Sequence, residues 1–63
     1  MIFEVYFNWY STLTAKQQSQ ARILHKAFQA AGVTSEKSRD LVRNLMQASI
    51  TSNEWPPAWV GWK

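Results

Sequence analysis

Apolar residues recur at helical spacing in two stretches of the chain, on either side of Gly32. In residues 15–31, placed about 100° apart around a helix axis, the apolar positions cover nearly half of the circumference. They are Ala21, Ile23, Leu24, Ala27, Phe28, Ala30 and Ala31. In residues 35–49 they are Leu41, Val42, Leu45, Met46 and Ala48. The pattern predicts one helix over about residues 15–31 and a second over about residues 35–49.

Capping residues mark the ends of both predicted helices. Thr14 followed by Gln17 fits a capping box, in which each side chain accepts a hydrogen bond from the other residue's backbone amide. Gly32 stands where a helix commonly ends in a left-handed residue, and Thr34 can cap the helix that follows. Because the connection is so short, the two helices must touch, and we expect an antiparallel helix–turn–helix hairpin.

In residues 2–10 the side chains would alternate between two sides of an extended chain. Phe3, Val5, Phe7 and Trp9 fall on one side, and Glu4, Tyr6, Asn8 and Tyr10 fall on the other. Such alternation in an aromatic-rich segment favours a strand or an extended chain, although the spacing of Phe3, Phe7 and Tyr10 leaves a helix open. We expect the extended form, which needs the C-terminal tail or a second protomer to pair with.

Residues 54–63 form a tail rich in tryptophan and proline. The consecutive prolines Pro56 and Pro57 fix an extended, polyproline-like path. The sequence therefore predicts a single small domain over residues 1–63, mainly α-helical, in which a helical hairpin carries extended aromatic N- and C-terminal segments.

Length and composition bear on how this fold is held together. A domain of 63 residues has a small core and commonly relies on disulfides, a structural metal or a partner chain. With no cysteine and one histidine, a zinc site of thiolate and imidazole ligands is excluded, and we expect no metal and no other cofactor. Nearly half of each predicted helix surface is apolar, and contact between the two helices would cover only part of it. We therefore expect a homodimer.

The sequence also bears on the compartment. No stretch approaches the roughly 20 apolar residues that a membrane span needs. The apolar N-terminus lacks the basic lead of a signal peptide, and Glu4 and Asn8 interrupt it. Together with the absence of cysteine, these features predict a cytoplasmic protein that has no membrane partner.

The chain has no recognisable set of catalytic residues. Its four carboxylates are scattered, and no cysteine or second histidine is present to form a nucleophile–base pair. His25 falls on the polar side of the first helix beside Arg22 and Lys26, where we expect an ordinary surface histidine. The sequence predicts that the protein is not an enzyme.

A first candidate surface would bind a partner protein. It combines Trp55, Trp59 and Trp62 with Arg39 and Arg43, because tryptophan and arginine dominate the hot spots of protein interfaces. The alternative for the tryptophans is that they fold back onto the hairpin or seal a dimer. Both interpretations stay open at the level of sequence.

A second candidate surface would bind DNA, because the segment around Gly32 is similar to the turn of bacterial helix-turn-helix regulators. That resemblance implies that Ser35, Lys37, Ser38 and Arg39 face the major groove, with Arg22 and Lys26 near phosphates. Phe28 and Ser38 depart from the pattern, which usually has a small residue at the first position and a branched apolar residue at the second. DNA binding is therefore the alternative function.

The helix–glycine–helix core, residues 21–50, and the aromatic segments 6–10 and 55–59 resemble small accessory proteins of temperate lambda-like bacteriophages. These proteins are encoded in the early (exo–xis) region. The resemblance implies a protein that binds a host factor and modulates host or developmental regulation, and it supplies no catalytic residues. On this basis we expect a non-enzymatic protein-interaction module.

Overall fold

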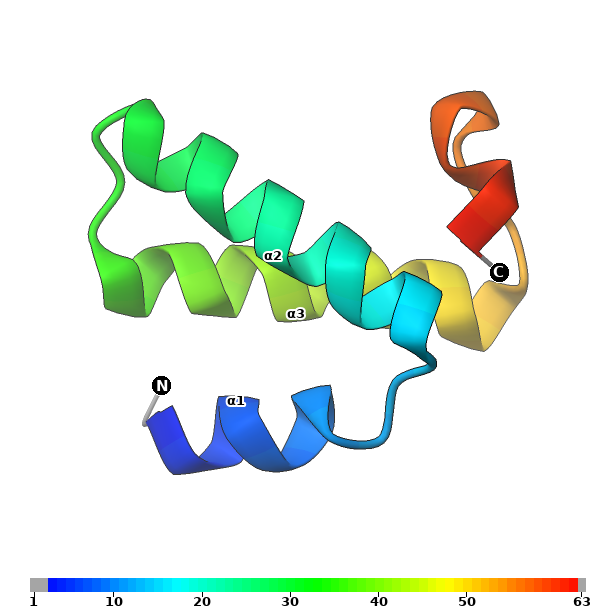
Figure 1. Ribbon diagram of the computed structural model, residues 1–63, viewed down its shortest axis with the longest axis horizontal. Coiled ribbons are helices and arrows are strands. Elements are labelled where there is room, and N and C mark those ends of the chain that lie inside the picture. Colours follow the sequence, from blue (N-terminus) through cyan, green and yellow to red (C-terminus); the bar gives the residue numbers. More distant parts are fainter. Residues whose placement is uncertain (1–2, 63) are drawn as a thin grey trace.

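The computed structural model describes residues 3–62, and the side chains of residues 4–61. Its elements are α1 (Phe3–Tyr10), α2 (Ala15–Ala30), α3 (Ser35–Ser52) and a 3-10 helix, η1 (Pro57–Trp62). α3 contacts both α1 and α2, and it lies between them in Figure 1. The described residues form no strand, so the fold is mainly helical.

The two helices predicted from the apolar spacing are α2 and α3, which run antiparallel (Figure 1). Two contacts fix their register: Gln29 Nε2 donates to Ser35 Oγ at 2.7 Å, and His25 Nδ1 lies 2.7 Å from Ser38 Oγ. α3 continues past the predicted end at residue 49. It ends at Ser52 and is capped by Asn53, whose φ of 55° is left-handed, a conformation that asparagine tolerates at the end of a helix.

The predicted caps are present at the starts of both helices. The Gln17 amide donates to Thr14 Oγ1 at 3.2 Å, and the Thr14 amide donates to Gln17 Oε1 at 3.1 Å, which completes the capping box. Thr34 Oγ1 accepts from the Lys37 amide at 3.3 Å. Each bond satisfies an amide that has no partner within its own helix.

Gly32 ends α2 in the left-handed conformation that the sequence predicts, with a φ of 92°. The Val33 amide donates to the Phe28 carbonyl, and the Gly32 amide donates to the Gln29 carbonyl, both at 3.0 Å. This pair of bonds is a Schellman motif, which satisfies the last carbonyls of a helix while the chain reverses. The turn therefore brings α3 back along α2.

The core lies where α2 and α3 meet. Ala21, Val42 and Met46 are fully buried, and Tyr6 of α1 joins them with 8% of its surface exposed. The small side chain of Ala21 lets α2 approach α3 closely. The core therefore combines residues of three helices.

The N-terminal segment is not extended, as the alternation suggested, but forms helix α1. Tyr6 lies three residues before Trp9 and four before Tyr10, so α1 gathers the three rings on one face. This face packs on the core, and Leu13, in the turn that follows α1, packs there too. A strand would split the three rings between two faces. Phe7 and Trp9, which a strand would place on one side, differ: Phe7 is 55% exposed, whereas Trp9 packs against the core.

The tail also departs from its prediction, because residues 57–62 form η1 rather than a polyproline path. Proline is tolerated in the first turn of a helix, where its missing amide hydrogen is not needed, and Pro57 occupies that position. The Trp59 amide donates to the Pro56 carbonyl at 2.8 Å. η1 contacts α2 at the end of the hairpin opposite the α2–α3 turn (Figure 1), and Trp55 packs against the core.

Replacing Gly32 by alanine tests the turn. A Cβ atom there would meet no atom within 4 Å, so the penalty comes from the left-handed backbone alone. We expect Gly32→Ala to lower the free energy of unfolding by about 1 kcal/mol in urea denaturation. Gly61→Ala is the matched control, since its Cβ also meets open space and its φ is not positive, and we expect it to be near neutral. Equal stability of the two variants would contradict this account of the turn.

Candidate functional site

A pocket of about 220 Å³ opens between α1 and the α2–α3 hairpin. We call it the aromatic–arginine pocket. Its lining residues are Tyr6, Phe7, Tyr10, Arg22, His25 and Arg39. α1 supplies the three aromatic rings, α2 supplies Arg22 and His25, and α3 supplies Arg39. None of these described lining residues carries a carboxylate.

Helical spacing explains why these side chains converge. Tyr6 and Tyr10 are one turn apart on α1, and Arg22 and His25 are one turn apart on α2, so each pair shares a face. Because α1 packs on the hairpin, its ring-bearing face meets the arginine-bearing sides of α2 and α3. The pocket therefore depends on how the elements pack.

Tyr6 is the centre of the aromatic wall. Its ring centroid lies 6.1 Å from that of Tyr10, with the planes nearly stacked, and 5.5 Å from that of Trp9. The His25 ring lies 6.5 Å away. Burial raises the pKa of the Tyr6 hydroxyl, the neighbouring Tyr10 adds to the rise, and the positive charge of Arg39 opposes it. Tyr6 is therefore a neutral phenol at physiological pH.

Arg22 is held at the exposed side of the pocket by two hydrogen bonds. Its Nη1 donates to the Tyr10 hydroxyl at 2.8 Å, and its Nη2 donates to Ser19 Oγ at 3.3 Å. Tyr10 is itself fixed from α2, because Gln18 Nε2 donates to its backbone oxygen at 3.1 Å. A guanidinium has more N–H donors than these two bonds use. Arg22 is thus positioned and still able to donate.

His25 is not the ordinary surface histidine that the sequence suggested. It is half-buried, and the fully buried Ser38 hydroxyl lies 2.7 Å from its Nδ1 and 3.1 Å from its backbone oxygen. Both contacts form together when Nδ1 carries a hydrogen and Ser38 donates to the carbonyl. Burial lowers the pKa of His25, and the nearby Arg39 lowers it further. The sequence contained a signal of this contact, because Ser38 falls at a core position and a buried hydroxyl needs a hydrogen-bond partner.

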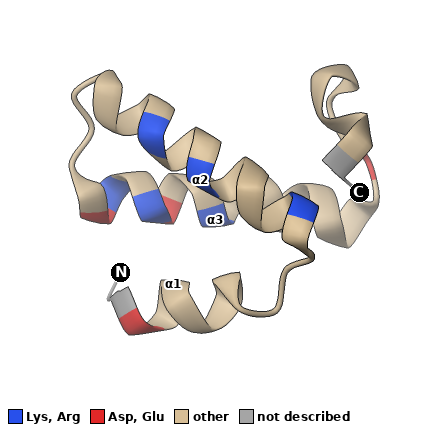
Figure 2. Ribbon diagram, in the orientation of Figure 1, with Lys and Arg blue, Asp and Glu red and all other residues tan. Residues whose placement is uncertain are grey.

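The structure does not gather the predicted DNA-binding residues on one exposed face. Ser38 is fully buried and bonded to His25, so it cannot reach a base edge. Arg22 and Arg39 line the aromatic–arginine pocket, whereas Ser35, Lys37 and Lys26 are exposed outside its lining. In the described part of the chain all lysines and arginines lie on α2 and α3, and none lies on α1 (Figure 2).

The predicted partner-binding set is also divided. Trp55 is half-buried against the core, and Trp59 and Arg43 are half-buried outside the lining of the pocket. The side chain of Trp62 lies outside the described residues. Among the predicted partner-binding residues whose side chains are described, only Arg39 lines the aromatic–arginine pocket. Sequence reasoning missed the three rings of α1, although their helical spacing was a usable signal.

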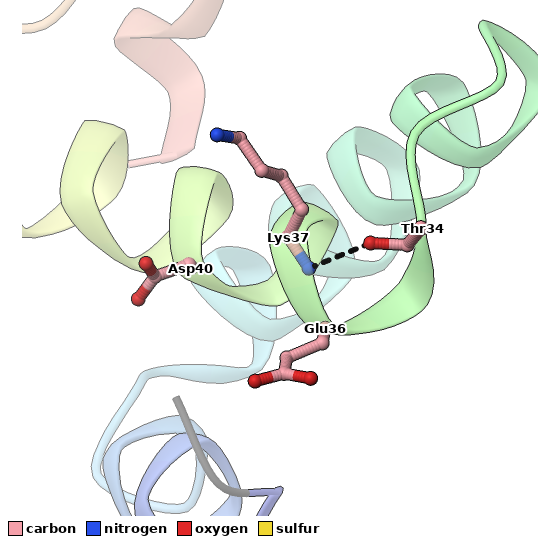
Figure 3. Close-up of a pocket in the computed structure, with 4 residues that line it drawn as sticks. All are labelled: Thr34, Glu36, Lys37 and Asp40. Carbon is pink, nitrogen blue, oxygen red and sulfur yellow. Dashed lines mark hydrogen bonds between the residues drawn. The ribbon is translucent and has the colours of Figure 1, made fainter.

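A second pocket, of about 280 Å³, lies at the start of α3 and is lined by Thr34, Glu36, Lys37 and Asp40. The Thr34 hydroxyl already accepts from the Lys37 amide, and the side chains of Glu36, Lys37 and Asp40 point apart (Figure 3). Their charges are mixed, and none of the described residues that line this pocket is aromatic. We therefore take the aromatic–arginine pocket as the candidate site.

Among the described residues, no group of three or more histidine, aspartate or glutamate side chains is placed to hold a metal ion. No helix in the described part of the chain is long and apolar enough to cross a membrane. No known protein family, curated protein or solved structure was found to match the chain.

The lowered pKa of His25 predicts how stability depends on pH. Below the ordinary pKa of 6.5 the unfolded chain binds a proton more readily than the folded one, so protonation favours unfolding. We expect the free energy of unfolding to fall between about pH 7 and pH 5.5, where carboxylates titrate little. In His25→Gln, which has no titrating ring, the same interval should be flat. Parallel pH profiles of the two proteins, measured by urea denaturation, would contradict the half-buried position of His25 beside Arg39.

Proposed function

We propose that the protein is a non-enzymatic protein-interaction module that binds its partner through the aromatic–arginine pocket. The main support for this proposal is that three helices bring aromatic rings and guanidinium groups together around an open pocket. Tyrosine and arginine are enriched among the residues that dominate binding energy in protein interfaces. Phe7, which lines this pocket and is 55% exposed, is placed to contact a partner directly.

The geometry of His25 and Ser38 supports binding rather than catalysis. A serine 2.7 Å from a histidine has the composition of a nucleophile–base pair. However, Ser38 is fully buried, so no substrate could reach its hydroxyl. The lining of the pocket offers no carboxylate to orient the imidazole. The pair is better explained as a polar contact that joins α2 to α3.

The kind of partner follows from the resemblance to small early-region phage proteins. We propose that a cytoplasmic host protein is the partner and that its binding modulates host or developmental regulation. The resemblance motivates this part of the proposal, and the open pocket supplies a surface for it.

A homodimer is not needed to cover the core, because α1 and Trp55 pack on the hairpin themselves. The accessible surface of 4191 Å² is also close to the roughly 4,200 Å² expected of a monomer of this mass. The exposed large apolar residues Val5, Phe7, Ile23, Leu45 and Val60 remain available to a second copy. Dimerisation therefore stays a prediction from the sequence. Sedimentation equilibrium at micromolar concentration tests it, and the monomer mass would contradict it.

The proposed function is tested by comparing two exposed apolar residues. Phe7 lines the aromatic–arginine pocket, whereas Ile23 is 53% exposed on α2 outside its lining. We expect immobilised wild-type protein and Ile23→Ala to retain the same protein from a bacterial lysate. Phe7→Ala should retain about tenfold less, because it removes a contact at the centre of the interface. Equal retention by Phe7→Ala, or no retained protein, would contradict the proposal.

A further inference from the structure

We propose that the aromatic–arginine pocket receives an acidic side chain of the partner protein, with an adjacent apolar side chain lying on its rings. This inference rests on the proposed function and specifies the chemistry of the segment that would be bound.

The charges of the lining support an anionic occupant. Arg22 and Arg39 come from different helices, and the lining residues that the structure describes include no carboxylate. Arg39 lines the pocket together with Tyr6 and His25, and its positive charge lowers the pKa of both groups. A carboxylate entering the pocket would therefore meet two guanidinium groups and no negative charge within the lining.

The geometry supports a carboxylate in particular. Arginine presents a planar set of N–H donors that matches the two oxygens of a carboxylate, which a lysine cannot do. The Arg22 guanidinium is oriented before any ligand binds, because the Tyr10 hydroxyl accepts from it at 2.8 Å. Such preorganisation reduces the entropy lost on binding.

The rings and the size of the pocket support a peptide side chain. The three rings of α1 offer an apolar surface beside the two guanidinium groups, suited to a leucine or phenylalanine next to the acidic residue. A volume of about 220 Å³ is below the roughly 300–1,000 Å³ typical of small-molecule sites. It suits one or two side chains of a docked segment better than a cofactor.

His25 offers a direct readout. It lines the pocket and faces Tyr6 of α1 and Ser38 and Arg39 of α3, while Arg22 lies one turn away on its own helix. A bound carboxylate would stabilise the protonated imidazole. The pKa of His25, followed by NMR titration of its ring protons, should therefore rise when an acidic ligand binds.

The test uses two blocked peptides, acetyl-Leu-Glu-Phe-amide and acetyl-Leu-Gln-Phe-amide, added to the full chain. NMR shifts of the Tyr6 and His25 rings report binding. We expect the glutamate peptide to bind about fivefold more tightly than the glutamine peptide, and it alone should raise the pKa of His25. Equal binding of the two peptides, or no ring shift with either, would overturn the inference.

Two variants test whether the preference for the glutamate peptide arises from the aromatic–arginine pocket. Arg22→Gln should reduce the preference for the glutamate peptide to less than about twofold, because one of the two guanidinium groups is lost. Lys26→Gln is the matched control, since Lys26 is exposed one turn further along α2, outside the lining, and the variant loses the same charge. An equal loss of preference in both variants would indicate a general charge effect and overturn the assignment.

The failure of this inference is distinguishable from failure of the proposed function. If Phe7→Ala loses the captured protein while Arg22→Gln retains it at the wild-type level, the pocket binds a partner but not through an acidic residue. If a short DNA duplex shifts the Tyr6 and His25 rings and the glutamate peptide does not, the occupant is a phosphate backbone. If Arg22→Gln converts a dimer to a monomer, the occupant is a second copy. Each of these results overturns the acidic-segment inference.

Discussion

The packing of Tyr6 against the α2–α3 hairpin is the contact on which the rest of the structure depends. Tyr6 is buried together with Ala21, Val42 and Met46, and its ring lies beside the rings of Tyr10 and His25. This contact holds α1 as a helix on the hairpin, and it covers apolar surface that a hairpin alone would expose. It also forms one wall of the aromatic–arginine pocket. Stability and the candidate site therefore share one residue.

The hairpin was predictable because its determinants are local. Each of these determinants depends only on residues that are near in the sequence. They are the capping box of Thr14 and Gln17, the left-handed Gly32 and the Thr34 cap. The N-terminal segment was not predictable in the same way, because its aromatic residues fit both a period of two and a helical period. The choice is made by packing on a surface that α2 and α3 create, which the segment's own sequence does not reveal.

The candidate site could be predicted only in part. Arg22 was predicted to belong to a DNA-binding surface, and Arg39 to that surface and to the partner-binding surface. The rings that accompany them were assigned to a strand. His25 looked solvent-exposed because its partner, Ser38, lies on another helix. A site assembled from three helices depends on their relative placement. That placement follows from long-range packing rather than from any motif, and no motif in this chain marks it.

The packing of α1 on the hairpin is tested most directly by measuring the contact between the Tyr6 and His25 rings, whose centroids lie 6.5 Å apart. A nuclear Overhauser measurement on the full chain at neutral pH reports it without any ligand or substitution. The account predicts cross-peaks between the ring protons of these two residues, together with helical amide contacts through α1. Their absence, with the Tyr6 ring exposed to solvent, would show that α1 does not pack on the hairpin and that the pocket does not form.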